Sequence, residues 1–468
     1  MKKLALLLLL SPLHMMAYQD PSAPKLTAPQ LIHLATAKDA PLQSAIRATF
    51  SAKDLKEGTA WVSEGPDFFF AVESATQPEL ILDDKTPGIS TLPSLPGKAT
   101  AMHSTESAGQ MQKLWYASAH ITEIGRSHTF HYMVDGKEFG GRLDVPAFGP
   151  LSYLQPGTPS GKLSGKITHT SKIYEGMTSD YWIYVPAQYD PKTPAALMVF
   201  QDGEGYTHRD SEPFVLNAID NLIAQKKIPV MICVFINPGD VTNAPGTPTY
   251  TLIKSHAEHF KRTIKDATRS TLYDTVSDRY DRYLRDEILA EVGKQYNLRS
   301  DPYSRAITGL SSGGICAFNA AWQLPDGTPQ FSRVLSWIGS FTSIQWKERE
   351  DVRDGGQDYP DKVLREPHRN IRVWLQDGAN DMENPNFGSW PMANIRMANA
   401  LKTREYDFHF SFGKGTHNTA QGAAEFPESM IWLWRDYDAA KTEQTYEPDP
   451  AEKSRPYFRV SVISRSAD

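Results

Sequence analysis

The stretch that most constrains the fold is residues 306–317, which read Ala-Ile-Thr-Gly-Leu-Ser-Ser-Gly-Gly-Ile-Cys-Ala. A short apolar strand enters a G-x-S-x-G pattern, and a run that favours a helix leaves it. A strand-to-helix turn of this kind is so sharp that it lifts one serine hydroxyl clear of the sheet. Gly309 and Gly313 flank Ser311 where any side chain would crowd the neighbouring backbone. The pattern predicts a nucleophile elbow at Ser311.

The position of this serine suggests its chemistry. Ser311 precedes the positive end of a helix, and the backbone N–H of Ser312 is placed to face an oxyanion. A G-x-S-x-G match alone is a modest signal, because glycine and serine are also common in loops. Its location between a strand and a helix is what favours a nucleophile.

A serine nucleophile needs a base and an orienting acid, which follow the serine along the chain in the order acid, then histidine. Residues 371–376 read as a strand, and carboxylates follow it at Asp377, Asp381 and Glu383. Residues 406–412 read as a second strand, which breaks into a glycine-flanked loop carrying His417. We predict His417 as the base and Asp381 as the acid. Asp377, which can instead cap the turn, and Glu383 are the alternatives.

The second oxyanion donor is expected from the loop after an earlier strand. Residues 195–200 are continuously apolar, as in a strand buried on both faces, and Asp-Gly-Glu-Gly follows at 202–205. The backbone N–H of Gly203 or Glu204 is the predicted donor. An ordinary strand–loop junction is the alternative interpretation.

Together these segments resemble the esterase family that holds enterochelin esterases, feruloyl and acetyl-xylan esterases, esterase D and the mycolyltransferases. The resemblance covers roughly residues 165 to 437 and extends to an entry strand at 180–190. It is nearest to the enterochelin-esterase-like branch, where the acid loop is commonly followed by Asn-Pro and Trp-Pro, here 384–385 and 390–391. It implies an α/β hydrolase, with a mostly parallel sheet and helices on both faces. It also implies a two-step acyl transfer through Ser311, His417 and Asp381 that needs no cofactor or metal.

Residues 42–148 have a different texture, with short β-like runs between turn residues, which predicts a small β-sandwich. They resemble the early-set immunoglobulin-like domains that precede the hydrolase in enterochelin esterases and some feruloyl esterases. The aromatics Trp61, Trp115, Tyr132 and Phe139 either fill the core of this sandwich or form stacking platforms for a ligand. A linker at 149–165, an esterase domain at 166–437 and a tail at 438–468, with a possible strand at 457–463, complete the predicted organisation.

The N-terminus has the form of a signal peptide, with Lys2 and Lys3, an apolar core at 4–10 and a small residue at Ala17. Residues 1–17 therefore predict export to a periplasm or beyond. No later stretch is apolar for long enough to span a membrane. A formal charge of −6 gives no reason to expect nucleic acid as a partner. The two cysteines, Cys233 and Cys316, read as buried small hydrophobes and not as a disulfide framework.

The resemblance leaves two substrate classes open: a sugar-linked ester, such as a feruloyl or acetyl group on polysaccharide, and a siderophore lactone. Four aromatic residues near the predicted strand ends are candidates to line an aromatic pocket, and core packing is the alternative for each: Tyr206, Trp346, Phe387 and Trp390. Two other functions remain as alternatives. One is acyl transfer to a sugar hydroxyl, as in the mycolyltransferases, and the other is a binding protein that has kept the fold.

Overall fold

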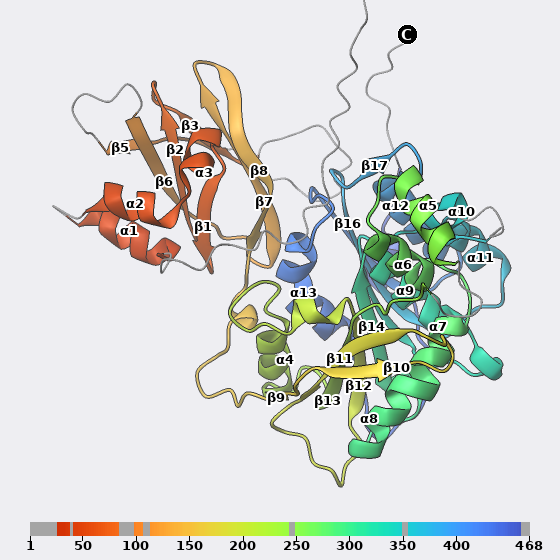
Figure 1. Ribbon diagram of the computed structural model, residues 1–468. Coiled ribbons are helices and arrows are strands. Elements are labelled where there is room, and N and C mark those ends of the chain that lie inside the picture. Colours follow the sequence, from red (N-terminus) through yellow and green to blue (C-terminus); the bar gives the residue numbers. More distant parts are fainter. Residues whose placement is uncertain are drawn as a thin grey trace, which may run out of the picture.

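The computed structural model describes residues 26–37, 41–83, 98–105, 113–242, 249–348 and 354–459. The predicted signal peptide at 1–17 lies outside these ranges. Two regions stand side by side, an N-terminal β region and a larger α/β region (Figure 1).

The larger region is built on one nine-stranded sheet. Its strands are β9 (Lys162–Leu163), β10 (Ile167–Thr170), β11 (Thr178–Val185), β12 (Ala196–Gln201), β13 (Met231–Ile236), β14 (Arg305–Leu310), β15 (Arg333–Trp337), β16 (Arg372–Gly378) and β19 (Asp407–Gly413). Their order is β10-β11-β13-β12-β14-β15-β16-β19, with β9 beside β11. The six strands from β13 to β19 pair in parallel. Strands β12, β13, β15 and β16 are buried along their whole length, and β12 and β13 read as apolar runs for this reason.

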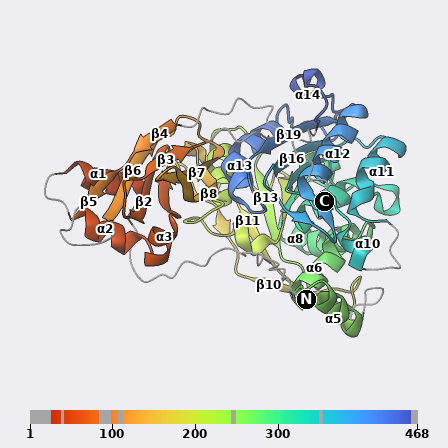
Figure 2. The same cartoon turned by 90° about the horizontal axis from the view of Figure 1, so that it is seen from above.

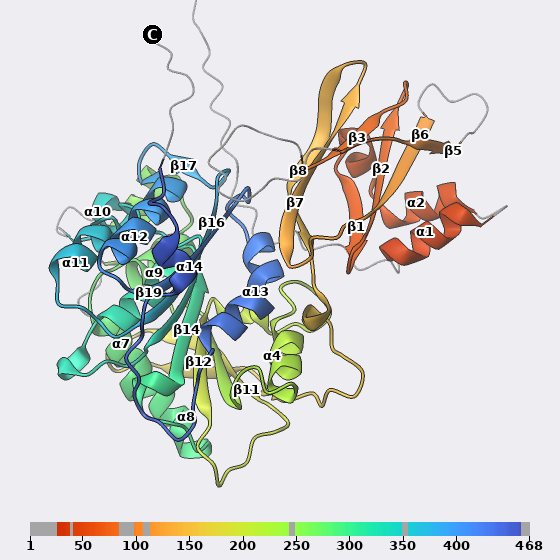
Figure 3. The same ribbon diagram turned by 180° about the vertical axis from the view of Figure 1, so that it is seen from behind.

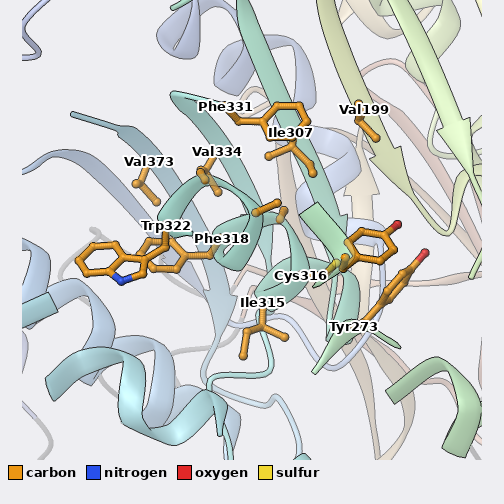
Figure 4. Close-up of a cluster of buried hydrophobic side chains, with 14 of the residues drawn as sticks. Val199, Tyr273, Ile307, Ile315, Cys316, Phe318, Trp322, Phe331, Val334 and Val373 are labelled. Carbon is orange, nitrogen blue, oxygen red and sulfur yellow. The ribbon is translucent and has the colours of Figure 1, made fainter. Parts of the chain in front are cut away.

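Helices cover both faces of this sheet, as the sequence predicts. The helices are α4 (Val215–Ala224), α5 (Tyr250–His259), α6 (Ile264–Tyr273), α7 (Arg279–Tyr283), α8 (Leu289–Gln295), α9 (Ser312–Trp322), α10 (Ile344–Glu348), α11 (Tyr359–Arg365), α12 (Trp390–Thr403) and α13 (Ala420–Leu433). One apolar cluster joins the sheet to α6–α9, α11 and α12, and a second joins its other face to α4 and α13. Figure 4 shows Ile315, Phe318 and Trp322 of α9 among side chains of the first cluster. The predicted α/β-hydrolase architecture is confirmed.

The N-terminal region contains two four-stranded antiparallel sheets. Their strands are β1 (Ala60–Glu64), β2 (Asp67–Ser74), β3 (Glu79–Leu82), β4 (Lys98–Ala101), β5 (His103–Thr105), β6 (Lys113–His120), β7 (Arg126–Val134) and β8 (Lys137–Ala147), in the orders β1-β2-β6-β5 and β4-β3-β7-β8. Both sheets contribute to one apolar cluster, as in a small sandwich. In this cluster Trp115 and Tyr132 are buried, and Trp61 and Phe139 pack against it, so these aromatics serve the core. The immunoglobulin-like class stays a prediction.

Three helices precede these strands: α1 (Ala28–Thr36), α2 (Leu42–Thr49) and α3 (Ala52–Glu57). Residues 42–49 and 52–57 are thus helical, although the sequence interpretation placed them in the predicted β-rich segment. Leu42 and Ile46 lie one helical turn apart and pack with Leu31 against the outer face of β2 and β6. That face of the sheet is apolar at Phe69 and Ala71, so it requires cover.

The segments that flank the α/β region close its edges. The predicted linker contains a 3-10 turn, η1 (Pro150–Ser152), and strand β9, which extends the main sheet. After α13 the chain forms α14 (Pro450–Ser454), and Phe458 packs on Phe410. Residues 457–459 form no strand, and the rest of the predicted strand at 457–463 lies outside the described residues. No helix among the described residues is long and apolar enough to cross a membrane.

The two regions meet along α13. Strands β7 and β8 pack on this helix, which Figures 2 and 3 show from above and from behind. Phe148 is buried beside Ala423 and Ala424 of α13, and its ring meets Phe214 edge to face at 4.9 Å. Helix α13, which covers one face of the main sheet, thus also serves as the docking surface of the β region.

Candidate active site

The candidate site lies at the carboxyl ends of the parallel strands, beside β12. The chain passes from β12 to β13 on one side of it and later forms β14 on the other side. In open α/β sheets such a switch point is where ligands bind. Ser311 stands between β14 and α9 with φ 59° and ψ −119°, a conformation that L-residues rarely adopt. The backbone N–H of Ser311 donates to the Trp337 carbonyl at 2.9 Å. The strained turn is therefore held by the neighbouring strand.

The elbow depends on close backbone approach at Gly309. A Cβ added there would lie 2.4 Å from the carbonyl carbon and oxygen of Gly313. At Gly313 an added Cβ would lie 3.0 Å from Asp202 Oδ2 and 3.1 Å from Gln201 Cβ. The G-x-S-x-G spacing thus has a steric origin, most strictly at the first glycine.

The three residues predicted as nucleophile, base and acid form one hydrogen-bonded row. Ser311 Oγ lies 2.8 Å from His417 Nε2, and His417 Nδ1 lies 2.5 Å from Asp381 Oδ1. Asp381 is buried and follows β16, whereas His417 is on the loop between β19 and α13. Glu383, an alternative acid, instead accepts the Ser389 hydroxyl at 2.6 Å.

Asp377, the other alternative, is buried beside Asp381 and does not contact the histidine ring. Burial, followed by the negative charge of Asp381 and a hydrogen bond with it, raises the pKa of Asp377 well above its ordinary range. Asp377 Oδ2 and Asp381 Oδ2 are both buried, and neither has a hydrogen-bond partner among the described residues. The raised pKa favours the neutral, protonated form of Asp377 beside Asp381.

A second chain of hydrogen bonds reaches Ser311 from the opposite direction. Trp390 Nε1–H donates to Ser340 Oγ at 3.1 Å, and Ser340 Oγ lies 3.2 Å from Ser311 Oγ. Because the tryptophan can only donate, the Ser340 hydroxyl is free to donate to Ser311. Ser311 then points its own proton at His417.

The loop after β12 is held against the elbow by Arg269 of α6. Arg269 Nε and Nη2 donate to the two oxygens of Asp202, at 2.7 and 2.5 Å, and Nη2 also donates to the Leu310 carbonyl at 3.2 Å. Asp202 has φ 55°, so its backbone turns sharply before Gly203. One guanidinium group thus fixes the distance between the two predicted oxyanion segments.

The predicted oxyanion donors lie on these two segments. Ser312 is the first residue of α9, and Gly203 and Glu204 open the 3-10 turn η2 (Gly203–Tyr206). The Glu204 N–H donates to Asn237 Oδ1 at 3.0 Å. An added Cβ at Gly203 would lie 2.2 Å from the backbone of β13, so only glycine fits there.

The four aromatic residues predicted to line a pocket differ in exposure. Trp390 is 1% exposed and packs edge to face on the ring of His417, the predicted base, at 5.3 Å. Tyr206 is buried against Phe200 and Trp337, and Phe387 is buried in a cluster with Ile344 and Trp390. Trp346 on α10 is 43% exposed. Three of the four thus pack in the protein interior, which was the alternative interpretation for each of them.

Sequence reasoning missed Ser340, Arg269 and the role of Trp390. Ser340 follows the end of β15, where a polar residue is a weak signal of a site. Arg269 lies on an amphipathic helix and looks like any solvated arginine in sequence. Among the described residues no group of three or more His, Cys, Asp and Glu side chains is arranged to hold a metal ion.

Comparison with known proteins places the chain among esterases. The sequence model of a family described as "Putative esterase" matches residues 178–433, more than half of the chain. No curated protein matches. The enterobactin esterase of Shigella flexneri is 15% identical, with 83% of this chain and 98% of that one covered and a TM-score of 0.49. A ferulic acid esterase of Anaeromyces mucronatus is 16% identical, with 61% and 94% covered and a TM-score of 0.44.

Proposed function

The chain belongs to this esterase family and is a carboxylic ester hydrolase, and we propose that Ser311 is its nucleophile, His417 its base and Asp381 its acid. The observation that carries the assignment is the hydrogen-bonded row from Ser311 Oγ through both ring nitrogens of His417 to Asp381. A carboxylate on Nδ1 leaves Nε2 as the acceptor for the serine proton.

The reaction then proceeds in two steps. His417 Nε2 takes the Ser311 proton as Oγ attacks the ester carbonyl, and the negative charge of Asp381 stabilises the imidazolium that forms. The tetrahedral intermediate collapses when His417 returns the proton to the leaving alcohol, which leaves an acyl group on Ser311. Water, deprotonated by His417, releases the acid by the same sequence.

The oxyanion is assigned to the Ser312 N–H and to one donor from the loop after β12, Gly203 or Glu204. Both segments flank Ser311, and the Arg269–Asp202 pair supports their spacing. For Glu204 to serve, its N–H must exchange Asn237 Oδ1 for the oxyanion. Such a donor is worth about 10²- to 10³-fold in kcat.

We assign the substrate to sugar-linked esters of the feruloyl or acetyl type, or to siderophore lactones of the enterochelin type. The enterochelin-like acid loop, with Asn384-Pro385 and Trp390-Pro391, supports the second class, and the β region preceding the hydrolase is compatible with both. Export, which the signal-peptide pattern at 1–17 supports, would place the enzyme with substrates outside the cytoplasm. Mass measurement of the protein from a periplasmic fraction tests the cleavage.

The test of the activity is hydrolysis of short p-nitrophenyl esters by the wild type and by Ser311→Ala. We expect kcat to fall by about 10⁴-fold or more in the variant, because removing the nucleophile leaves only binding and the oxyanion donors. Ser211→Ala, at an exposed loop serine, is the matched control and should keep full activity. Equal activity of Ser311→Ala and wild type would refute the assignment. A panel of feruloyl, acetyl-xylan and enterochelin-type esters then separates the substrate classes.

A further inference from the structure

The N-terminal β region contacts the loop that carries the proposed base. We call residues 413–419, between β19 and α13, the histidine loop. Asp144 on β8 accepts the Thr416 backbone N–H through Oδ1 at 2.8 Å, and the Thr416 hydroxyl donates to Oδ2. A carboxylate from a separate region of the protein thus binds both the backbone and the side chain of the residue before His417.

The histidine loop has other anchors near its two ends, and within the loop Asn418 donates to the Thr416 hydroxyl and carbonyl, at 3.1 and 2.8 Å. Asn380 of the acid loop donates to the carbonyls of Lys414 and Gly415, at 2.6 and 3.2 Å. At the other end, Asn418 Oδ1 accepts the Ala420 N–H at 2.9 Å as α13 begins. Thr416 and His417 lie between these anchors. The bonds from Asp144 therefore act on the middle of the loop.

The loop needs such support because its backbone is intrinsically free. Gly413 and Gly415 lie on the approach to His417, and glycine allows more backbone conformations than any other residue. A rotation of the Thr416 peptide would carry the His417 ring away from Ser311. Proton transfer requires the two heavy atoms to stay within hydrogen-bond reach, so such a rotation would slow it directly.

The β region also docks through contacts that do not involve Asp144. Phe148 is buried between α13 and Phe214, and Arg126 Nη1 lies 2.7 Å from Glu428 Oε2 on α13. The Arg126–Glu428 pair is exposed, at 42% and 54%, and does not touch the histidine loop. The junction between the two regions thus contains one polar contact that reaches the histidine loop, through Asp144, and one that does not, through Arg126.

We propose that Asp144 is a positioning residue for His417, so that the β region takes part in catalysis by fixing the histidine loop. The inference rests on the proposed function, because it takes His417 to be the base. It assigns the β region a role that requires no binding of sugar or any other ligand.

The test compares Asp144→Ala, Asp144→Asn and Arg126→Ala in the full-length protein, with kcat, KM and melting temperature measured for each. We expect Asp144→Ala to lower kcat by about 100-fold, the effect of displacing a catalytic group by roughly 1 Å, with KM nearly unchanged. Asp144→Asn keeps an oxygen that accepts the Thr416 N–H, and should recover most of this loss. Arg126→Ala removes an exposed ion pair of the same junction and should match the wild type.

Two results would overturn the proposal: a kcat for Asp144→Ala close to that of the wild type, or an equal loss of kcat in Arg126→Ala. If Asp144→Ala does not fold, Thr416→Val provides the second test, since it removes the hydroxyl that donates to Asp144 and accepts from Asn418, and keeps the backbone N–H. It should lower kcat by about fivefold, as expected for one hydrogen bond. A wild-type kcat in Thr416→Val would equally overturn the proposal.

Failure of this proposal is distinguishable from failure of the proposed function. A wild-type protein that neither hydrolyses esters nor reacts with a fluorophosphonate at Ser311 would refute the function. A wild type that does both, alongside an equally active Asp144→Ala, would refute only the positioning role.

Discussion

The serine side and the histidine side of the site are built in different ways. Ser311 sits on a turn fixed by its own strand and helix, in a segment where backbone meets backbone at Gly309 and Gly313. His417 and Asp381 lie on loops, and the histidine loop is hydrogen-bonded to Asn380 and Asp144. The proposed nucleophile is thus placed by local sterics and the core, and the proposed base by polar contacts between distant parts of the chain.

This difference determines what substitutions on each side should change. A steric fault on the serine side cannot relax, because α9 is buried and packed against the sheet. A lost hydrogen bond on the histidine side leaves the fold intact and lets a loop move. We therefore expect stability effects from the first and kinetic effects from the second.

The largest effect should follow Gly309→Ala. The new Cβ would meet the Gly313 backbone at 2.4 Å, and we expect a loss of about 3 kcal/mol in the free energy of unfolding together with loss of activity. Gly293→Ala on α8 is the control, since nothing lies within 4 Å of its added Cβ. It should be neutral or stabilising by about 0.5–1 kcal/mol. Urea unfolding measures both, and a Gly309→Ala protein as stable as the wild type would contradict the steric account.

Asp381→Asn should act on kinetics alone. We expect kcat to fall by about 10⁴-fold, because an amide cannot hold the required tautomer or stabilise the imidazolium. Asp377→Asn should cost about tenfold or less, because its amide N–H₂ can still donate to Asp381 as the carboxylic acid does. Steady-state kinetics on both variants decides which carboxylate is the acid, and equal losses would contradict the assignment.

Asp377 also predicts a pH dependence of stability. Its pKa is raised in the folded protein by burial, whereas in the unfolded chain it ionises near pH 4. Above that pH the folded state holds a proton that the unfolded state has released, so the stability due to this group falls as pH rises. Asp377→Asn does not titrate and should lose less stability than the wild type between about pH 4 and 7. Identical pH slopes in urea unfolding would argue against a protonated Asp377.

Arg269→Gln should perturb the serine side without unfolding it. Loss of the bidentate bond to Asp202 frees the loop that carries the second oxyanion donor, and we expect kcat to fall by about 10- to 100-fold. Arg282→Gln, which breaks an exposed pair with Asp278, is the control and should leave kcat unchanged. Similar kinetics in the two variants would show that activity does not require the bond between Arg269 and Asp202.

The smallest effect is expected for Ser340→Ala. Removing one hydrogen bond to Ser311 Oγ should lower kcat by about fivefold. Trp390→Phe, which keeps a ring against His417 but loses the N–H, should have a similar effect. The double variant should be less than additive, because both changes break the same chain. Full additivity would mean that the two residues act separately.

Much of the architecture could be predicted from the residues alone. The apolar run of β12, the strand-forming segments of β14 and β16 and the glycines around Ser311 are local signals, and the order Ser, Asp, His along the chain follows from the strand order. The α/β-hydrolase fold and the esterase family were therefore confirmed. The helical residues 42–57 were misjudged, because Leu42 and Ile46 show their apolar face only against the sheet that they cover.

The sequence by itself determined where the proposed nucleophile stands, because a sharp turn needs glycine within a few residues of the serine and leaves that signature in the chain. Only the tertiary structure decided what surrounds the proposed base: the Ser340–Trp390 chain, and Asp144 reaching Thr416 from 272 positions away. Hydrogen bonds between distant segments leave no spacing that can be read from the sequence. They are set by how the sheets and helices pack, and that packing places the histidine.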